Sequence, residues 1–210
     1  MSIPLWLAYV LQLAAGVTAI EAGYSPVAPS RATAYAAAAL YHGLHAGVDP
    51  YELVAIARNE SDFIERDRSP DGMDCGLTQT RITNSRFTCS ELRASYWLAF
   101  QEAARELSEN ARACRGAIDF DRCRLNRYNS GVRYARHGAH GRYWLRVTCF
   151  AEAARARVPV GTACRSVLRA ADIDRIAHGR PRPRPRDTVV HVSDHGHVAV
   201  AVAVATHDHD

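Results

Sequence analysis

Glu60 is the residue whose type and position most directly suggest chemistry. It follows Leu53 by seven residues and Ile56 by four, so on a helix its carboxyl falls within an apolar stripe. A carboxylate in such a place is costly unless it is paired or protonated. Because desolvation raises its pKa, Glu60 is a candidate general acid near neutral pH. The alternative is a structural glutamate that pairs with an arginine such as Arg58 or Arg81.

Glu60 stands at the head of an ordered series of short motifs. Asn59-Glu60-Ser61 is followed by Ser69-Pro70-Asp71-Gly72, then by Gly76-Leu77-Thr78-Gln79, and later by Arg127-Tyr128-Asn129-Ser130-Gly131. This series resembles the soluble lytic transglycosylases of bacterial walls, a lysozyme-like family. That family has Glu-Ser at a helix end, a Gly-Leu-Met-Gln loop and an Ala-Tyr-Asn-x-Gly helix end. The resemblance covers residues 31–154.

The resemblance implies a role for each matching residue. Glu60 matches the single catalytic acid/base of the family. Ser69, Gln79 and Tyr128 match residues that line its glycan cleft, and Asn129 completes the third motif and shapes the cleft wall. The implied partner is the glycan strand of peptidoglycan, and neither a metal nor another cofactor is required.

The implied mechanism uses one carboxylate, whereas an ordinary glycosidase needs two. Glu60 would protonate the oxygen between N-acetylmuramic acid and N-acetylglucosamine, and the substrate's acetamido group would stabilise the cation at C1. Glu60 would then take the C6 hydroxyl proton, which closes a 1,6-anhydro ring. If Asp62, Asp67, Asp71 or Asp74 supplied a second carboxylate, the outcome would be hydrolysis by a muramidase. A non-catalytic glycan-binding module is the remaining alternative.

The sequence departs from the family pattern at two positions and has one extra residue between Glu60 and Gln79, around Met73-Asp74-Cys75. Thr78 stands where the family has Met, which predicts a smaller and more polar wall at one sugar subsite. Arg127 replaces a small residue before the Tyr-Asn pair. Tyr143 matches a late aromatic residue of the family.

Helical signals surround these motifs. Residues 31–46 form an alanine-rich helical pattern, and Asp49-Pro50 followed by Glu52 predicts the start of the next helix. We expect that helix to carry its apolar stripe from Leu53 to Phe63 and Ile64. The turn-rich stretch 65–87 predicts a long loop.

A second capping box, Thr88 to Glu91, predicts the start of one helix that continues to Leu107. Further helices are expected near residues 121–128, 142–154 and 165–176. No alternating pattern predicts a strand before residue 188. The expected fold class is therefore all-α: a lysozyme-like helical domain with an active-site cleft.

Composition shifts divide the chain into four segments. Residues 1–24 are an apolar N-terminal segment that suits a signal-like sequence, a membrane anchor or an extra buried helix of the domain. Residues 25–178 are the lysozyme-like transglycosylase domain, and residues 179–187 are an Arg/Pro linker. Residues 188–210 are a His-rich tail, expected as a small hairpin or a disordered segment, with metal binding less favoured.

The even cysteine count and the apolar N-terminus favour an exported protein, and the alternative is reduced, buried cysteines that act as small hydrophobic residues. Among 210 residues, 48% hydrophobic and 23% charged residues exclude wholesale disorder. A net charge of +4, carried by arginine alone, is too weak to indicate nucleic acid. The six cysteines predict three disulfides between sequence neighbours, at 75–89, 114–123 and 149–164. We expect a monomer in the periplasm or outside the cell, associated with the membrane if the N-terminal segment anchors it.

Overall fold

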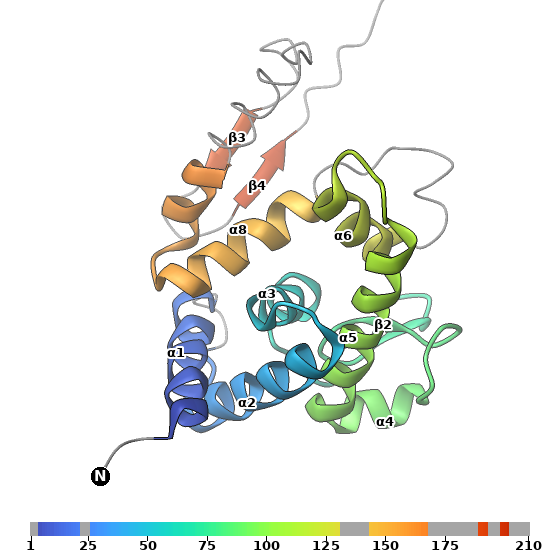
Figure 1. Cartoon of the computed structure of the whole chain (residues 1–210). Helices are drawn as coiled ribbons and strands as arrows, with labels where there is room; N and C mark the ends of the chain where they lie inside the picture. Colours follow the sequence, from blue (N-terminus) through green and yellow to red (C-terminus); the bar gives the residue numbers. More distant parts are fainter. Residues whose placement is uncertain (1–3, 22–25, 131–142, 168–188, 193–197, 202–210) are drawn as a thin grey trace, which may run out of the picture.

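A computed structural model describes residues 4–21, 26–130, 143–167, 189–192 and 198–201. The described chain is mostly helical, which confirms the all-α class (Figure 1). The helices with assigned bounds are α1 (Leu5–Ile20), α2 (Pro29–Ala46), α3 (Pro50–Ser61), α4 (Cys89–Ala94), α5 (Tyr96–Ala113), α6 (Phe120–Ser130) and α8 (Tyr143–Ala156). The strands are β1 (Asp74–Cys75), β2 (Thr80–Arg81), β3 (Val189–Val192) and β4 (Val198–Ala201).

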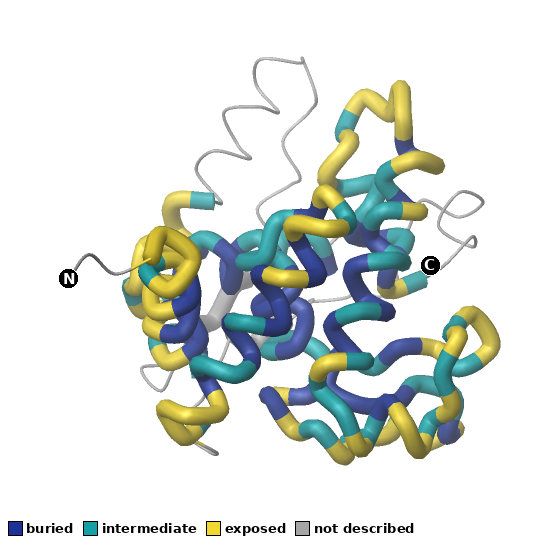
Figure 2. Tube along the Cα trace, turned by 60° about the horizontal axis from the view of Figure 1, so that its bottom comes forward, coloured by how far each residue is buried: buried dark blue, intermediate teal, exposed yellow. Residues whose placement is uncertain are grey.

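Helix α3 is the centre of the fold, with α1, α2, α5 and α8 packed around it (Figure 1). Its residues 53–57 are all fully buried, so the helix is covered on every side rather than along one stripe. Figure 2 shows the buried residues gathered in the interior of the helical bundle. The predicted start of α3 is confirmed, because Asp49 caps it by accepting a hydrogen bond from the Tyr51 amide at 3.0 Å and Pro50 takes the first helical position.

The predicted end of α3 was wrong. The helix ends at Ser61, because Asp62 adopts a left-handed conformation with φ of 52°. Phe63 then turns inward and stacks on Tyr35, with ring centroids 5.8 Å apart, whereas Ile64 is 50% exposed. Glu60 therefore lies in the last turn of α3, where the central helix reaches the long loop.

Helix α1 is packed into the core. Val10, Leu13, Val17 and Ile20 are buried, and a Cβ at Gly16 would meet the Ala154 carbonyl oxygen of α8 at 2.6 Å. Of the three expectations for the N-terminal segment, this packing matches the buried helix of the domain. No helix in the described ranges combines the length and apolarity needed to cross a membrane.

The region from 62 to 95 departs from the expected pattern twice. The capping box is confirmed, with reciprocal bonds between Thr88 and Glu91. The single helix expected after it is two helices, because Ser95 takes an extended conformation and caps α5 by accepting from the Leu98 amide at 3.3 Å. Strands β1 and β2 form a two-residue antiparallel pair inside the loop, although the sequence predicted no strand there.

The later elements follow the predictions where the structure describes them. Helix α6 is described as far as Ser130, so the predicted stop at Gly131 lies outside the described residues, and α8 covers the expected helix. Strands β3 and β4 pair in antiparallel fashion, as a tail hairpin would. The turn at 194–196, the linker at 179–187 and the second half of the helix expected at 165–176 lie outside the described residues.

All three predicted disulfides are confirmed: Cys75–Cys89, Cys114–Cys123 and Cys149–Cys164. Each joins cysteines that are neighbours in the sequence. Disulfides persist in oxidising environments, so these three indicate an exported protein.

Candidate functional site

The Glu60 carboxyl has little compensation for its burial. Its side chain keeps some surface at the solvent, but protein atoms surround the carboxyl group, and this burial raises its pKa above the ordinary value. Its one hydrogen bond within the described chain comes from the Asn59 amide at 3.2 Å. The expected alternative, a pair with Arg58 or Arg81, is absent from the described contacts: Arg58 bonds Asp62 and the Ile20 carbonyl, and Arg81 bonds Asp71 and Asp74.

Two stacked tyrosines lie beside Glu60. Tyr128 of α6 and Tyr143 of α8 have ring centroids 6.3 Å apart and planes inclined by 19°. The Tyr128 hydroxyl donates to the Thr78 carbonyl at 2.9 Å. The Tyr143 hydroxyl is buried and lies within reach of the Glu60 carboxyl, whose pKa it lowers, but it has no bond of ordinary geometry to any described residue. Burial and the charge of Glu60 raise the pKa of both tyrosines.

The Gly76–Gln79 turn borders this site. Ser61, next to Glu60, donates its hydroxyl to the Leu77 carbonyl at 2.6 Å, which holds the turn against the end of α3. Gly76 has φ of 77°, and a Cβ there would meet the Leu92 carbonyl oxygen at 2.5 Å, so the turn requires glycine. Gln79 is also left-handed, with φ of 46°, and its amide donates to the Gly76 carbonyl at 2.9 Å.

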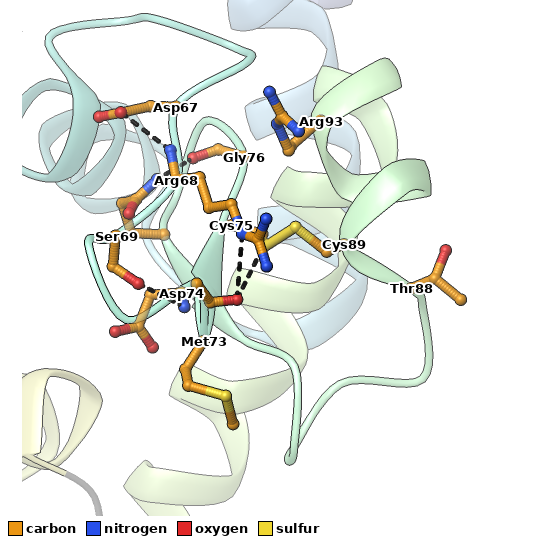
Figure 3. The surroundings of a disulfide bond; sticks show 12 residues. Asp67, Arg68, Ser69, Met73, Asp74, Cys75, Gly76, Thr88, Cys89 and Arg93 are labelled. Atoms are coloured by element: carbon orange, nitrogen blue, oxygen red, sulfur yellow. Dashed lines mark hydrogen bonds between the residues drawn. A yellow bond between two sulfur atoms is a disulfide. The ribbon is translucent and has the colours of Figure 1, made fainter.

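A disulfide fastens this loop to the helical body (Figure 3). Cys75 of β1, which directly precedes Gly76, is bonded to Cys89, the first residue of α4. In the same region the Ser69 hydroxyl accepts from the Asp74 amide at 2.9 Å and donates to Asp71 at 2.5 Å. Ser69 therefore shapes the loop from within.

Thr78 does not line a sugar subsite, contrary to the prediction. It is fully buried, and its hydroxyl bonds the Ala99 carbonyl of α5 at 3.2 Å and the Thr80 hydroxyl at 3.0 Å. The smaller, polar residue is accommodated because both partners lie inside the protein. Thr78 thus connects the loop to α5, while its carbonyl holds Tyr128.

The structure gathers some of the predicted residues and leaves others apart. Tyr128 and the turn that carries Gln79 lie against the end of α3 that bears Glu60. Ser69 makes its described contacts within its own loop, and Asn129 is exposed on α6 with no described contact to Glu60.

Sequence reasoning missed Glu106 of α5. It is half-buried, has no hydrogen bond or ion pair among the described residues, and its charge contributes to raising the pKa of Tyr128 and Tyr143. Burial raises the pKa of Glu106 to about 7. No motif marks this residue, and only the fold brings α5 to the tyrosines. Asp74 of β1 is the other neighbouring carboxyl, and burial raises its pKa too.

No group of three or more His, Cys, Asp or Glu side chains within the described segments is arranged to hold a metal ion. His191 belongs to β3, and the other tail histidines lie outside the described residues. No family model, curated protein or solved structure matches the chain.

Proposed function

We propose that this protein has a lysozyme-like fold and is a peptidoglycan lytic transglycosylase. It would cleave the bond between N-acetylmuramic acid and N-acetylglucosamine and leave 1,6-anhydromuramic ends. The observation that carries the proposal is the Glu60 carboxyl at the end of the central helix, which is buried and has no ion pair among the described residues, although the charge of Arg146 is near enough to lower its pKa. The stacked tyrosines and the pinned Gly76–Gln79 turn on its flanks fit the motif order of the resembled family.

The site supplies what one acid/base group needs. Because burial raises its pKa, Glu60 holds its proton to higher pH than a free glutamate does and could transfer it to the glycosidic oxygen as the bond to C1 breaks. The acetamido oxygen of the substrate then stabilises C1. The new Glu60 carboxylate accepts the C6 hydroxyl proton as O6 bonds to C1, which returns the enzyme to its starting state. The Asn59 amide and the Tyr143 hydroxyl favour the carboxylate form between the two steps.

Hydrolysis by a muramidase is the second candidate function, and two neighbouring carboxyls favour it. Asp74 is close enough for its charge to raise the pKa of Glu60. Glu106 is ionised in about half the molecules at pH 7, since its pKa is about 7. Either could activate a water molecule or stabilise the cation as the second carboxylate of an ordinary glycosidase.

Digestion of purified peptidoglycan, followed by mass analysis of the released muropeptides, tests the proposal. Anhydro products support the transglycosylase. Reducing ends support the muramidase, and the absence of products supports the non-catalytic binding module. The protein must be prepared with its disulfides formed, because Cys75–Cys89 holds the turn beside Glu60.

A matched pair of variants ties the products to Glu60. Glu60→Gln should abolish product release. Asp62→Asn changes the next carboxylate along the chain, which is exposed and pairs with Arg58. Asn tolerates the left-handed conformation of that position, so this variant should keep activity. Products that disappear in Asp62→Asn but persist in Glu60→Gln would reverse the assignment.

A further inference from the structure

A pocket away from Glu60 lies between α2 and α5. Its volume is about 380 Å³, within the range of small-ligand sites. Helix α5 contributes residues that recur every three or four positions and so share one face, and Glu106 is on another face of the same helix. The lining residues are Tyr41, His42, His45, Ala46, Gln101, Ala104, Arg105, Ser108 and Arg112.

The aromatic rings of Tyr41, His42 and His45 line this α2–α5 pocket, and Trp97 of α5 packs against them from outside the lining. Tyr41 is 43% exposed and Trp97 is 39% exposed, yet their ring centroids lie 5.2 Å apart. The His45 ring lies 4.1 Å from Tyr41, and the His42 ring lies 4.6 Å from Trp97. Single exposed aromatic residues are common on protein surfaces, but a contiguous group of exposed aromatic rings indicates a binding face.

His42 brings an unmet hydrogen-bonding group to the pocket. It is 7% exposed, and its Nε2 atom is buried without a partner among the described residues. Burial, together with the charge of His45, lowers its pKa to about 4, so the ring is neutral at pH 7. A buried polar atom without a partner costs free energy, which a ligand hydroxyl in the pocket would recover.

The charge of the pocket comes from arginine. Arg105 is already neutralised by Glu102 and Glu109. Arg112 has no ion pair within the described chain, and its guanidinium donates to the Ser108 hydroxyl at 3.3 Å, which holds it at the pocket. No carboxylate lines the pocket, so the Arg112 guanidinium is available for a bidentate bond to an anion.

We propose that the α2–α5 pocket binds an acidic saccharide, a pyranose ring that carries a carboxylate. The C–H face of the ring would lie on Tyr41, since aromatic faces attract partial positive charge. The carboxylate would bond Arg112, and the hydroxyls would bond Gln101, Ser108 and His42. This binding does not rest on the proposed catalytic function. The saccharide could come from wall glycan, as muramic acid, or from a uronic acid polymer.

Titration of the full chain with four probes tests the proposal. The probes are N-acetylmuramic acid, glucuronic acid, uncharged N-acetylglucosamine and inorganic phosphate. Their binding is measured by calorimetry and by the change in fluorescence of Trp97. We expect at least one acidic sugar to bind about tenfold more tightly than the uncharged sugar, and phosphate not to bind. The better acidic sugar identifies the source. Equal binding of phosphate, or no binding of either acidic sugar, would overturn the proposal.

Variants separate this pocket from the Glu60 site. Arg112→Ala should weaken the binding of acidic sugars about tenfold and leave the affinity for the uncharged sugar unchanged. Tyr41→Ala should weaken the binding of both kinds of sugar. Arg115→Ala and Tyr9→Ala remove an exposed arginine and an exposed tyrosine elsewhere and should change nothing. Binding that survives Arg112→Ala and Tyr41→Ala but is lost in Gln79→Ala would place the sugar at the Glu60 site and refute the inference.

Discussion

Glu102 and Glu60 are both helical glutamates removed from water, yet their surroundings are opposite. Glu102 of α5 is fully buried and neutralised: Arg86 lies 3.2 Å away, Arg105 lies 2.8 Å away, and the Arg86 amide donates at 3.1 Å. Glu60 of α3 accepts one hydrogen bond, from the neutral Asn59 amide, and only the Tyr143 hydroxyl and the more distant charge of Arg146 add to it in lowering the Glu60 pKa. Burial by itself therefore does not distinguish a catalytic carboxyl from a structural one. The difference lies in whether the surrounding protein compensates the charge.

The two glutamates also differ in their structural roles. Glu102 ties the end of the long loop to α5, because it accepts three hydrogen bonds from Arg86 in that loop. Among the described residues Glu60 makes no ion pair that ties another element to α3. Glu102 stabilises the fold, whereas burial of the less compensated Glu60 costs stability, which fits our proposal that its proton is used in catalysis.

The largest expected effect comes from Glu60→Gln. The variant keeps the size of the side chain but removes the titrating proton. Since one group serves as acid and then as base, activity on peptidoglycan should fall by about 10⁴-fold, the upper end for general acid–base catalysis. The free energy of unfolding should stay equal or rise, because a neutral amide replaces a desolvated carboxyl. Turnover and urea denaturation measure the two quantities.

Retention of more than about a tenth of wild-type turnover would contradict this role, since acid–base catalysis is worth at least about 10²-fold. Glu60 would then be structural like Glu102. The acid would have to be sought among Asp62, Glu65, Asp74 and Glu106, and the family resemblance would not extend to the chemistry.

Glu102→Gln should show the reverse pattern. The variant loses two ion pairs in a buried setting, which should lower the free energy of unfolding by about 3 kcal/mol, while turnover per folded molecule stays near wild type. The lower end of the usual cost applies because Arg86 is half exposed and can turn to water. Denaturant melts measure the loss.

Glu109→Gln is the matched control for Glu102→Gln. Glu109 pairs with the same Arg105, but its side chain is 48% exposed. Its loss should cost less than about 1 kcal/mol. An equal cost for both variants would mean that compensation in the buried site contributes no more than a surface pair.

Local signals predicted the parts of this fold that local chemistry decides. Asp49 and Thr88 carry their caps within a few residues, and the three disulfides close short loops, so the sequence was sufficient. The motifs also placed Glu60, Gln79 and Tyr128 in the same neighbourhood, which the contacts through Thr78 and Leu77 bear out in geometry.

Nonlocal packing decided what the sequence could not predict. Phe63 leaves α3 because Tyr35 of α2 offers it a stacking partner, and Thr78 is buried because Ala99 of α5 accepts its hydroxyl. Glu102 and Glu106 have similar sequence surroundings. They differ in their neighbours in the fold: arginines surround Glu102, whereas tyrosines lie near Glu106.

Removal of the Cys75–Cys89 bridge tests the loop that joins the two regions. Cys75→Ala with Cys89→Ala should lower the free energy of unfolding by about 3 kcal/mol, given a sequence separation of 14. Activity should fall as well, because the Gly76–Gln79 turn is released. The Cys114–Cys123 double variant, with a separation of 9, should lose slightly less stability and keep its activity. Equal activity losses in both would deny the turn a special role.

A small effect is expected for Glu106, which like Glu60 has no ion pair among the described residues but lies on the helix of Glu102. Its pKa is about 7 in the folded chain against 4.5 for the free group. Between those pH values the folded state binds more protons than the unfolded state, so the free energy of unfolding falls as pH rises from 4.5 to 7 and is constant above. Glu106→Gln should remove this fall. It should match the wild type at pH 4 and exceed it at pH 8.

The gain at pH 8 should be about 1 to 2 kcal/mol, below the limit of about 3 kcal/mol that the full pKa difference implies, because the side chain is partly exposed. Urea denaturation at pH 4, 6 and 8 measures it as a difference between variant and wild type, which cancels the parallel contribution of Glu60. If the free energy of unfolding of Glu106→Gln depends on pH as it does in the wild type, the charge of Glu106 is compensated like that of Glu102. Glu60 would then be the one carboxyl of the three whose charge is poorly compensated.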